Sequence, residues 1–307
     1  MISELAIVIP CYKGKYLKTT LDSLVAQTNK NFTVYIGDDN SKDNIEEIIA
    51  NYVSKINITY HKFQNNLGSQ SLVQQWERCI FLSKEEPWIW ILPDDDYIEI
   101  NCVEVFLNKC YSFDTNLFRF NTNVVDENGR LIESDCVNPP FETGIQFIAD
   151  KLLGNRRSSV AEYIFSRNIF LKKRITEFPT AWCSDDATWL NFSEKKGICT
   201  LQDAFVNVRI SNESISGNTG KYDQLKIDAC LAYLKFLKKD HFPELTAEFT
   251  KKNTSFNTVT KRWFLIQLAN STIKFSLIEK MKLFKKISEV WNGLDKFKMI
   301  YFILKRY

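Results

Sequence analysis

The first 95 residues alternate between short apolar runs and segments whose apolar residues recur at helical spacing. The apolar runs are residues 5–9, 32–36, 56–60 and 88–92, and the segments with helical spacing are 17–25, 45–53 and 72–80. Short apolar runs that alternate with helices are typical of parallel strands buried on both faces of a sheet. The sequence therefore predicts an α/β fold, in which helices flank an open, Rossmann-like and mostly parallel sheet.

Polar or acidic residues follow three of these predicted strands. They are residues 11–13 (Cys-Tyr-Lys), 38–41 (Asp-Asp-Asn-Ser) and 94–96 (Asp-Asp-Asp). Open sheets of this kind bind ligands at the carboxyl ends of their strands. We therefore expect the three segments to form one ligand site.

The acidic triplet Asp94, Asp95 and Asp96 has two interpretations of equal weight when taken alone. Adjacent carboxylates repel one another unless a cation lies among them, and Mg²⁺ or Mn²⁺ prefers such hard oxygen ligands together with substrate phosphates. The alternative is a solvated turn that caps the next helix. The pair Asp38 and Asp39 on its own favours an ordinary loop, but its place on the same sheet edge as the triplet favours a ligand site.

Charge divides the chain unevenly. The net charge is +3, yet residues 251–307 hold 13 Lys/Arg against three Asp/Glu, so the first 250 residues carry −7. This asymmetry suggests an acidic catalytic body and a basic tail suited to an acidic surface. The Gly/Ser/Asn-rich segment 215–220 is the best boundary, which predicts a catalytic domain over 1–220 and a helical, basic region over 221–307.

The basic region shows apolar residues at roughly helical spacing from 263 onward, with Lys280, Lys282, Lys285 and Lys286 between them. Basic amphipathic helices can lie on anionic lipid. The alternative, which we favour, is packing on the catalytic domain or on a second subunit. A homo-oligomer and a weak peripheral membrane contact are therefore both considered.

Other features exclude several classes. The start of the chain does not resemble a signal peptide, and no run of about 18 apolar residues predicts a transmembrane helix. The eight cysteines show no zinc spacing and favour free thiols in a reducing cytosol. We expect a cytoplasmic protein with no nucleic-acid partner.

A third acidic group lies further along the chain. A strand is predicted over 118–125, a turn over 126–129 and a short strand over 163–165, and a loop at 178–180 then leads to residues 184–189 (Ser-Asp-Asp-Ala-Thr-Trp). Asp185 and Asp186 open a short predicted helix there, so their alternative role is an ordinary N-terminal cap.

Several of these segments together resemble one known family. Residues 6–12 (Ala-Ile-Val-Ile-Pro-Cys-Tyr), 21–28 (Leu-Asp-Ser-Leu-Val-Ala-Gln-Thr), the Asp38-Asp39 segment and residues 66–68 (Asn-Leu-Gly) are similar to family 2 glycosyltransferases of GT-A fold. The acidic triplet resembles the DxD-type metal motif of that family. The likeness is strong over residues 5–98, weaker to about 215 and absent beyond, and it suggests a bacterial surface-polysaccharide type.

The resemblance implies a role for each strand end in binding a nucleotide-diphosphate sugar. Pro10 and Tyr12 should border the base, which one of Asp38 and Asp39 should hydrogen-bond and which is usually uracil. Asp94 should lie near the ribose. Asp95 should hold the Mn²⁺ or Mg²⁺, with Asp96 as the alternative ligand, because Pro93 stands where the first aspartate of the motif often lies.

The resemblance also implies which residues act on the sugar acceptor. In inverting members the second acid of a Glu-Asp pair, here Asp186 after Asp185, acts as general base on the acceptor hydroxyl. Arg209, in a segment similar to the polar stretch that closes the site, could reach the diphosphate or the acceptor, or form a surface salt bridge. The implied function is an inverting, metal-assisted transfer of a sugar from a nucleotide-diphosphate donor, usually UDP-linked, to a glycan or lipid-linked glycan in polysaccharide biosynthesis.

Two other functions are alternatives to this one. A catalytically silent relative would serve as a binding or scaffold subunit, and the presence of both acidic clusters disfavours it. A sugar-1-phosphate nucleotidyltransferase should carry a Gly-rich basic loop after the first strand, where this chain has only Gly14.

Overall fold

The computed structural model describes residues 3–134, 137–211, 220–273 and 275–306. It contains two compact units. The sheet unit comprises residues 1–144, 157–176 and 188–211, and the helical unit comprises 145–156, 177–187 and 212–307. Residues 145–156 and 177–187 thus belong with the C-terminal helices, a division that sequence spacing alone does not indicate. The predicted boundary segment 215–220 lies outside the described residues except for Gly220, so a domain boundary there remains a prediction.

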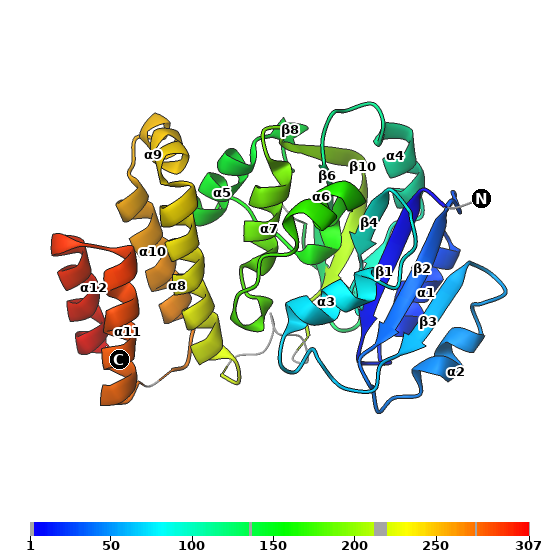
Figure 1. The fold of residues 1–307 in the computed structure, drawn as a ribbon, viewed down its shortest axis with the longest axis horizontal. Helices are drawn as coiled ribbons and strands as arrows, with labels where there is room; N and C mark the ends of the chain where they lie inside the picture. Colours follow the sequence, from blue (N-terminus) through cyan, green and yellow to red (C-terminus); the bar gives the residue numbers. More distant parts are fainter. Residues whose placement is uncertain (1–2, 135–136, 212–219, 274, 307) are drawn as a thin grey trace. The chain divides into compact units, whose positions relative to one another are not determined.

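The sheet unit is built on one ten-stranded sheet with the strand order β3-β2-β1-β4-β9-β6-β10-β5, and β7 pairs with β6 and β8 with β10 (Figure 1). The strands are β1 Leu5–Cys11, β2 Phe32–Asp38, β3 Ile58–Lys62, β4 Trp88–Ile91, β5 Tyr97–Ile98, β6 Leu117–Val125, β7 Leu131–Ser134, β8 Phe141–Glu142, β9 Tyr163–Ser166 and β10 Ile198–Arg209. The predicted strands are all present, with ends shifted by one or two residues.

The pairings fix the direction of every strand. The strands β1, β2, β3, β4, β6 and β10 run in the same direction, whereas β5, β7, β8 and β9 run against them. The predicted α/β fold with a mostly parallel sheet is therefore confirmed. The carboxyl ends of β1, β2, β4 and β10 consequently lie on the same edge.

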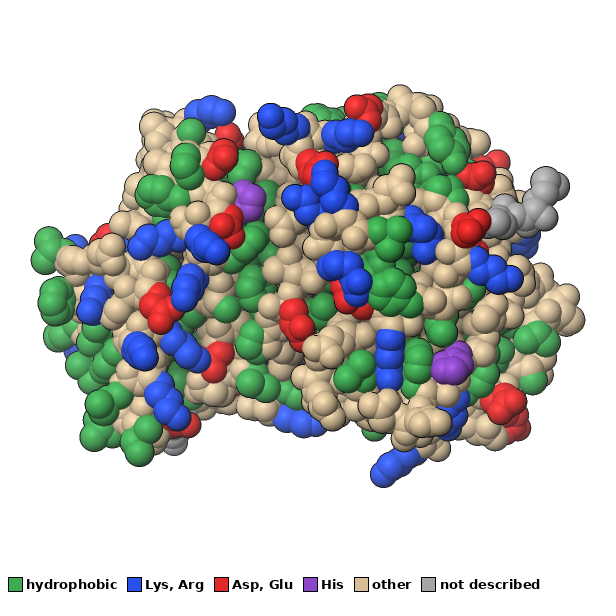
Figure 2. Space-filling model, in the orientation of Figure 1, with side chains coloured by type: hydrophobic (Ala, Val, Ile, Leu, Met, Phe, Trp, Pro, Cys, Tyr) green, Lys and Arg blue, Asp and Glu red, His purple; other side chains and the backbone are tan. Residues whose placement is uncertain are grey.

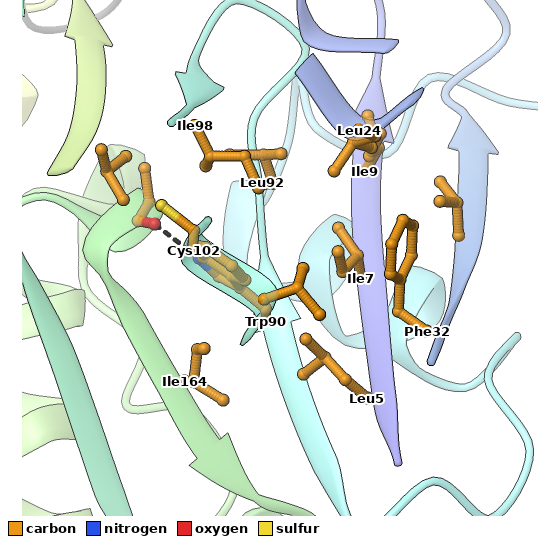
Figure 3. Close-up of a cluster of buried hydrophobic side chains, with 14 of the residues drawn as sticks. Leu5, Ile7, Ile9, Leu24, Phe32, Trp90, Leu92, Ile98, Cys102 and Ile164 are labelled. Atoms are coloured by element: carbon orange, nitrogen blue, oxygen red, sulfur yellow. Dashed lines mark hydrogen bonds between the residues drawn. The ribbon is translucent and has the colours of Figure 1, made fainter. Parts of the chain in front are cut away.

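Buried side chains pack the helices of the sheet unit against this sheet. The helices of the sheet unit are α1 Leu17–Val25, α2 Ile45–Ala50, α3 Leu72–Ile80, α4 Cys102–Lys109 and α6 Arg167–Lys173. Figure 3 shows Leu5, Ile7 and Ile9 of β1 in the same cluster as Trp90 of β4 and the following Leu92, all of them fully buried. Because β1 is apolar along its whole length, it can be buried on both faces in the middle of the sheet.

The helical unit contains α8 Asp223–Asp240, α9 Phe242–Lys251, α10 Phe256–Ala269, α11 Leu277–Val290 and α12 Gly293–Arg306, together with most of α5 Gly144–Leu153 and the first turn of α7 Ser184–Ser193. A capping box between Ser276 and Glu279 begins α11. The predicted helical C-terminal region is confirmed, and the predicted apolar positions Phe264, Leu283 and Ile287 are buried. Within the described residues, no helix combines the length and the apolar character that a membrane span needs.

The cysteines do not form disulfides in the described part of the chain. Seven of them are buried free thiols, and Cys136 lies outside the described residues.

Candidate functional site

The first strand end and the acidic triplet are joined by a single carboxylate. Asp94 Oδ2 accepts hydrogen bonds from the backbone N–H of Tyr12 at 2.8 Å and of Lys13 at 2.9 Å. Burial raises the pKa of Asp94, and these two N–H groups oppose the rise. Asp94 therefore fixes the loop after β1 against the loop after β4, as the shared sheet edge predicted.

Asp96 is also held by the protein. It is buried, and its Oδ1 accepts a hydrogen bond of 2.8 Å from the backbone N–H of Arg209 at the end of β10. The Thr20 hydroxyl of α1 donates to the Asp96 carbonyl at 2.7 Å. Burial, together with the charge of Asp95, raises the pKa of Asp96 well above its ordinary value. Asp96 thus ties β10 and α1 to the triplet.

Asp95 differs from both neighbours. Its side chain is partly exposed, and among the described residues no donor other than its own backbone N–H is directed at its carboxylate. Burial and the charge of Asp94 raise its pKa to about 7. A bound cation would reverse that rise, because an opposite charge favours the ionised form. Of the three aspartates, Asp95 is the one whose oxygens are free for a ligand.

A divalent cation fits this arrangement only with help from substrate. The described residues contain no group of three His, Cys, Asp or Glu side chains that could hold a metal ion. Mg²⁺ and Mn²⁺ commonly take one or two carboxylates and complete their shell with phosphate oxygens and water. Asp95 supplies a ligand of that kind, whereas one oxygen of Asp96 is already taken by Arg209.

Arg209 lies against the triplet without forming a surface salt bridge. It is buried, and its Nε donates to the Asp95 carbonyl at 3.0 Å while Nη1 donates to the carbonyls of Asp126 and Glu127 at 3.0 Å each. Its guanidinium also lies over the ring of Tyr16, 4.4 Å from the centroid. The surface alternative is therefore wrong, because burial and backbone carbonyls hold this side chain. Residues 212–216 of the closing segment lie outside the described residues.

The aspartate pair at the end of β2 organises two neighbouring loops. Asp38 Oδ1 accepts from the backbone N–H of Ser41 at 2.7 Å, and its Oδ2 accepts from the Tyr60 hydroxyl at 2.8 Å. Asp39 Oδ1 accepts from the N–H of Leu67 at 2.7 Å, and its Oδ2 from that of Gly68 at 2.9 Å. Both aspartates are buried, and burial raises the pKa of Asp39.

The environment of Asp39 explains why residue 68 is glycine and which group Arg78 binds. A Cβ on Gly68 would lie 2.6 Å from Asp39 Oδ2, so the close approach requires glycine. Arg78 of α3 forms an ion pair with Asp39 and lies over the ring of Phe63 at 3.8 Å. Arg78 therefore lies beside one of the two aspartates expected to meet the base.

The remaining predicted donor residues lie on β1 and just after it. Pro10 is partly buried and pairs with Gly37 in the register of β1 and β2. Tyr12 is exposed at the same edge, and its carbonyl accepts a hydrogen bond of 2.6 Å from the Ser41 hydroxyl. The loops after β1 and β2 are therefore linked directly.

The second acidic pair lies in the helical unit, at the start of α7. Asp186 is buried, and its Oδ1 lies 2.6 Å from the Nζ of Lys151 on α5, with side-chain exposures of 2% for Asp186 and 19% for Lys151. Burial alone would lower the pKa of Lys151, but the charges of Asp186 and Asp185 raise it above its ordinary value. Lys151 is thus a charged partner of the pair.

Asp185 is the more accessible member of the pair. It is partly exposed, and burial together with the charge of Asp186 raises its pKa to about 7. The hydroxyl of Tyr233 on α8 is buried near these carboxylates and has no hydrogen-bond partner among the described residues. Sequence reasoning missed both Lys151 and Tyr233. A lysine within the apolar sequence of α5 was the one local signal available for Lys151.

Together, a mostly parallel sheet with acidic residues gathered at its carboxyl edge and a helical region defines the GT-A class of fold. Residues 6–160 match the model of Glycosyl transferase family 2. The chain belongs to this family.

Curated relatives agree with this assignment. An uncharacterized glycosyltransferase of Rickettsia felis is 32% identical over 151 residues, which cover 47% of this chain and 24% of that protein. Glycosyltransferase GlyG of Streptococcus pneumoniae is 26% identical over 179 residues, covering 57% of this chain and 58% of that protein. The matched part of the chain thus spans between a quarter and somewhat over half the length of these relatives.

Solved structures share the fold. TarS 1–349 of S. aureus in complex with UDP-GlcNAc superposes with a TM-score of 0.69 at 14% identity, over 94% of this chain and 82% of that one. The mannosyltransferase PcManGT from Pyrobaculum calidifontis, in complex with GDP-Man and Mn²⁺, gives a TM-score of 0.56 at 10% identity over 99% of this chain and 86% of that one. At these identities the likeness concerns the fold alone.

Proposed function

We propose that this protein is an inverting glycosyltransferase that moves a sugar from a nucleotide-diphosphate donor, UDP-linked, to a hydroxyl of a glycan or lipid-linked glycan. One observation carries the proposal. In the acidic triplet, Asp94 and Asp96 are fixed by backbone N–H groups, whereas the Asp95 carboxylate between them is left for a ligand. Family membership and neighbours solved with nucleotide sugars support the choice of donor.

The residues proposed to bind the donor lie at the carboxyl edge of the sheet. Tyr12 and Pro10 border the base, and Asp39, which Arg78 and the 66–68 loop hold in place, accepts a hydrogen bond from it; Asp38 is the alternative. Asp94 lies near the ribose. Mn²⁺ or Mg²⁺ held by Asp95 would neutralise the charge that grows on the departing diphosphate.

Arg209 adds positive charge beside the triplet. Its Nε and Nη1 are committed to backbone carbonyls. We propose that the guanidinium stabilises the diphosphate electrostatically while it holds the loop after β4 in place. Asp96 is the alternative metal ligand.

On the acceptor side, Asp186 acts as general base. It removes the proton of the acceptor hydroxyl as that oxygen attacks the anomeric carbon on the face opposite the leaving nucleotide, which inverts the centre. A base of this kind contributes about 10²–10⁴ in rate. Lys151 orients the buried Asp186 through this ion pair, in which its Nζ lies 2.6 Å from Asp186 Oδ1. Asp185, partly exposed and with a pKa near 7, is the alternative base.

The family and the basic C-terminal region support the proposed acceptor class. A lipid-linked precursor of a surface polysaccharide would place the enzyme in the cytoplasm at the inner face of the plasma membrane. The protein would then act as a peripheral enzyme, alone or as a homo-oligomer.

The test is a thermal-shift panel of UDP- and GDP-linked sugars with and without Mn²⁺, followed by an assay of donor hydrolysis. A true donor raises the unfolding temperature, because binding stabilises by RT ln(1 + [L]/Kd). We expect a shift with one UDP-sugar that needs Mn²⁺, and slow release of UDP. Binding without any release of UDP would indicate a catalytically silent relative, and no shift with any nucleotide sugar would refute the proposal.

A further inference from the structure

The last two helices of the chain are apolar on two opposite faces. On α11, Leu283, Ile287 and Val290 are buried, and on α12 Met299 and Ile303 are buried. These inward faces fulfil the packing role that the sequence favoured. They do not account for the apolar residues on the outward faces.

The outward face of α12 is an apolar stripe. Leu294, Phe297, Tyr301 and Leu304 follow one another at intervals of three and four residues, so they share one side of the helix. All four are exposed, Phe297 and Tyr301 by 66% and 67%. The buried Met299 and Ile303 project from nearly the opposite side of the same helix.

The first five residues of α11 repeat this pattern. Leu277, Ile278 and Met281 are exposed, although each is a large apolar residue. α11 and α12 pack against each other within the helical unit. Figure 2 shows hydrophobic side chains gathered at the left of the view, over the helices that Figure 1 labels α11 and α12.

Lysines border the outward apolar faces of α11 and α12. Lys282 and Lys285 on α11 and Lys298 and Lys305 on α12 are exposed, and none of the four forms an ion pair with another described residue. By contrast, Lys261 and Lys286 in the same unit pair with Asp295 and Asp228. The four lysines without an ion pair to another described residue are therefore available on the outward side of α11 and α12.

The positive charge of this surface favours anionic lipid over a second copy of the chain as the partner that covers it. In a symmetric dimer through these helices, the same lysine-bordered patch of two copies would meet, and like charges brought together in an interface are costly. An anionic lipid surface offers acidic head groups to the lysines and an acyl boundary to the apolar side chains. Helices that carry a large apolar face with flanking lysines lie in that boundary.

We propose that the outward faces of α11 and α12 form a membrane-docking surface for anionic lipid. The apolar side chains Leu277, Ile278, Met281, Leu294, Phe297, Tyr301 and Leu304 enter the head-group boundary, and the lysines Lys282, Lys285, Lys298 and Lys305 bind acidic head groups. This surface holds the helical unit at the bilayer and requires no transfer activity.

The test is sedimentation of the full chain with vesicles of phosphatidylcholine, with and without about one third phosphatidylglycerol. We expect binding to the anionic vesicles alone, weakening as salt rises. Replacing the four lysines by glutamine should weaken it by roughly 10²-fold or more, since each lysine near the surface is worth about fivefold. Phe297→Ser with Tyr301→Ser should weaken it at least about tenfold through lost apolar burial.

Phe113→Ser with Leu171→Ser, which alters two exposed apolar residues of the sheet unit, is the matched control and should bind like the wild type. Circular dichroism and thermal unfolding check that every variant is folded. The proposal fails if the wild type does not sediment with anionic vesicles, or if the Phe297/Tyr301 variant binds as tightly as the control. It also fails if light scattering finds a dimer that this variant dissociates while vesicle binding is absent, because a second copy then covers the surface.

Discussion

Replacing Lys151 by methionine should destabilise the helical unit strongly at neutral pH. The change keeps most of the side-chain volume but leaves Asp186, only 2% exposed, without its counter-charge at 2.6 Å. Removing one partner of a buried ion pair typically costs about 3–5 kcal/mol. We expect a loss of this size in the free energy of unfolding, measured by urea titration at pH 7.5 with circular dichroism.

The pH dependence identifies the cause. The pKa of folded Asp185 is already raised to about 7 with Lys151 present, and loss of the lysine, whose charge opposes that rise, raises the pKa of Asp185 further. A carboxyl whose folded pKa is raised destabilises the fold above that pKa, and the cost disappears as pH falls toward its unfolded value near 4. The difference between Lys151→Met and wild type should therefore be greatest above about pH 7 and shrink toward pH 5.

A second lysine of the helical unit provides the control. Lys252, just after α9, forms an ion pair of 2.9 Å with Asp150, the neighbour of Lys151 on α5. The Lys252 side chain is 32% exposed. Lys252→Met should cost less, about 1 kcal/mol, because a pair with more contact to solvent contributes less to stability. The double variant Lys151→Met/Asp186→Asn should recover much of the loss, since the uncompensated charge is gone. The reasoning is refuted if Lys151→Met unfolds at the same urea concentration as Lys252→Met, or if its cost does not change with pH.

Three other predictions concern the proposed transfer. Asp95→Asn should weaken Mn²⁺-dependent binding of UDP at least about tenfold in calorimetry. The urea midpoint should stay near wild type, because no other described residue donates a hydrogen bond to this carboxylate. Equal affinity would remove Asp95 from the metal site. Asp186→Asn should keep donor binding and lower transfer by about 10²–10⁴ in a radiolabelled-sugar assay. If Asp185→Asn lowers transfer and Asp186→Asn does not, the base is Asp185. Gly68→Ala should destabilise the fold by about 1–3 kcal/mol and weaken UDP binding, since its Cβ would press on Asp39 Oδ2; a variant as stable as wild type would show that the loop moves at no cost.

The first half of the sheet could be predicted because its signal is local. β1, β2 and β4 are short, mostly apolar and buried runs, and β3 begins with Ile58, Thr59 and Tyr60. Polar residues and a helical pattern follow each strand. The strand-end rule for parallel sheets then placed Tyr12, Asp38 and Asp94 on one edge. The structure confirms that the loops carrying them are linked by hydrogen bonds.

The second half of the sheet was harder to predict. Strand β10 was not predicted, although it spans Ile198–Arg209 and pairs with β6. Its register shifts between Leu201 and Phe205, and Gln202 and Asp203 are exposed there, so the alternation of apolar and polar residues is interrupted. A bulge of this kind satisfies the pairing of the sheet while it hides the strand period in the sequence.

The sequence by itself determined the fold class, the family and the types of residue available for chemistry, because short apolar periods and adjacent carboxylates are properties of neighbouring residues. Only the tertiary structure decided which carboxylates are free. Asp94 and Asp96 are neighbours of Asp95 with the same side chain, yet each has one carboxylate oxygen bound by backbone N–H groups, from the loop just after β1 and from the end of β10. The same holds for Asp186, whose partner Lys151 comes from a different helix. Hydrogen bonds and ion pairs between distant segments depend on how the chain folds back on itself, and no local pattern encodes them.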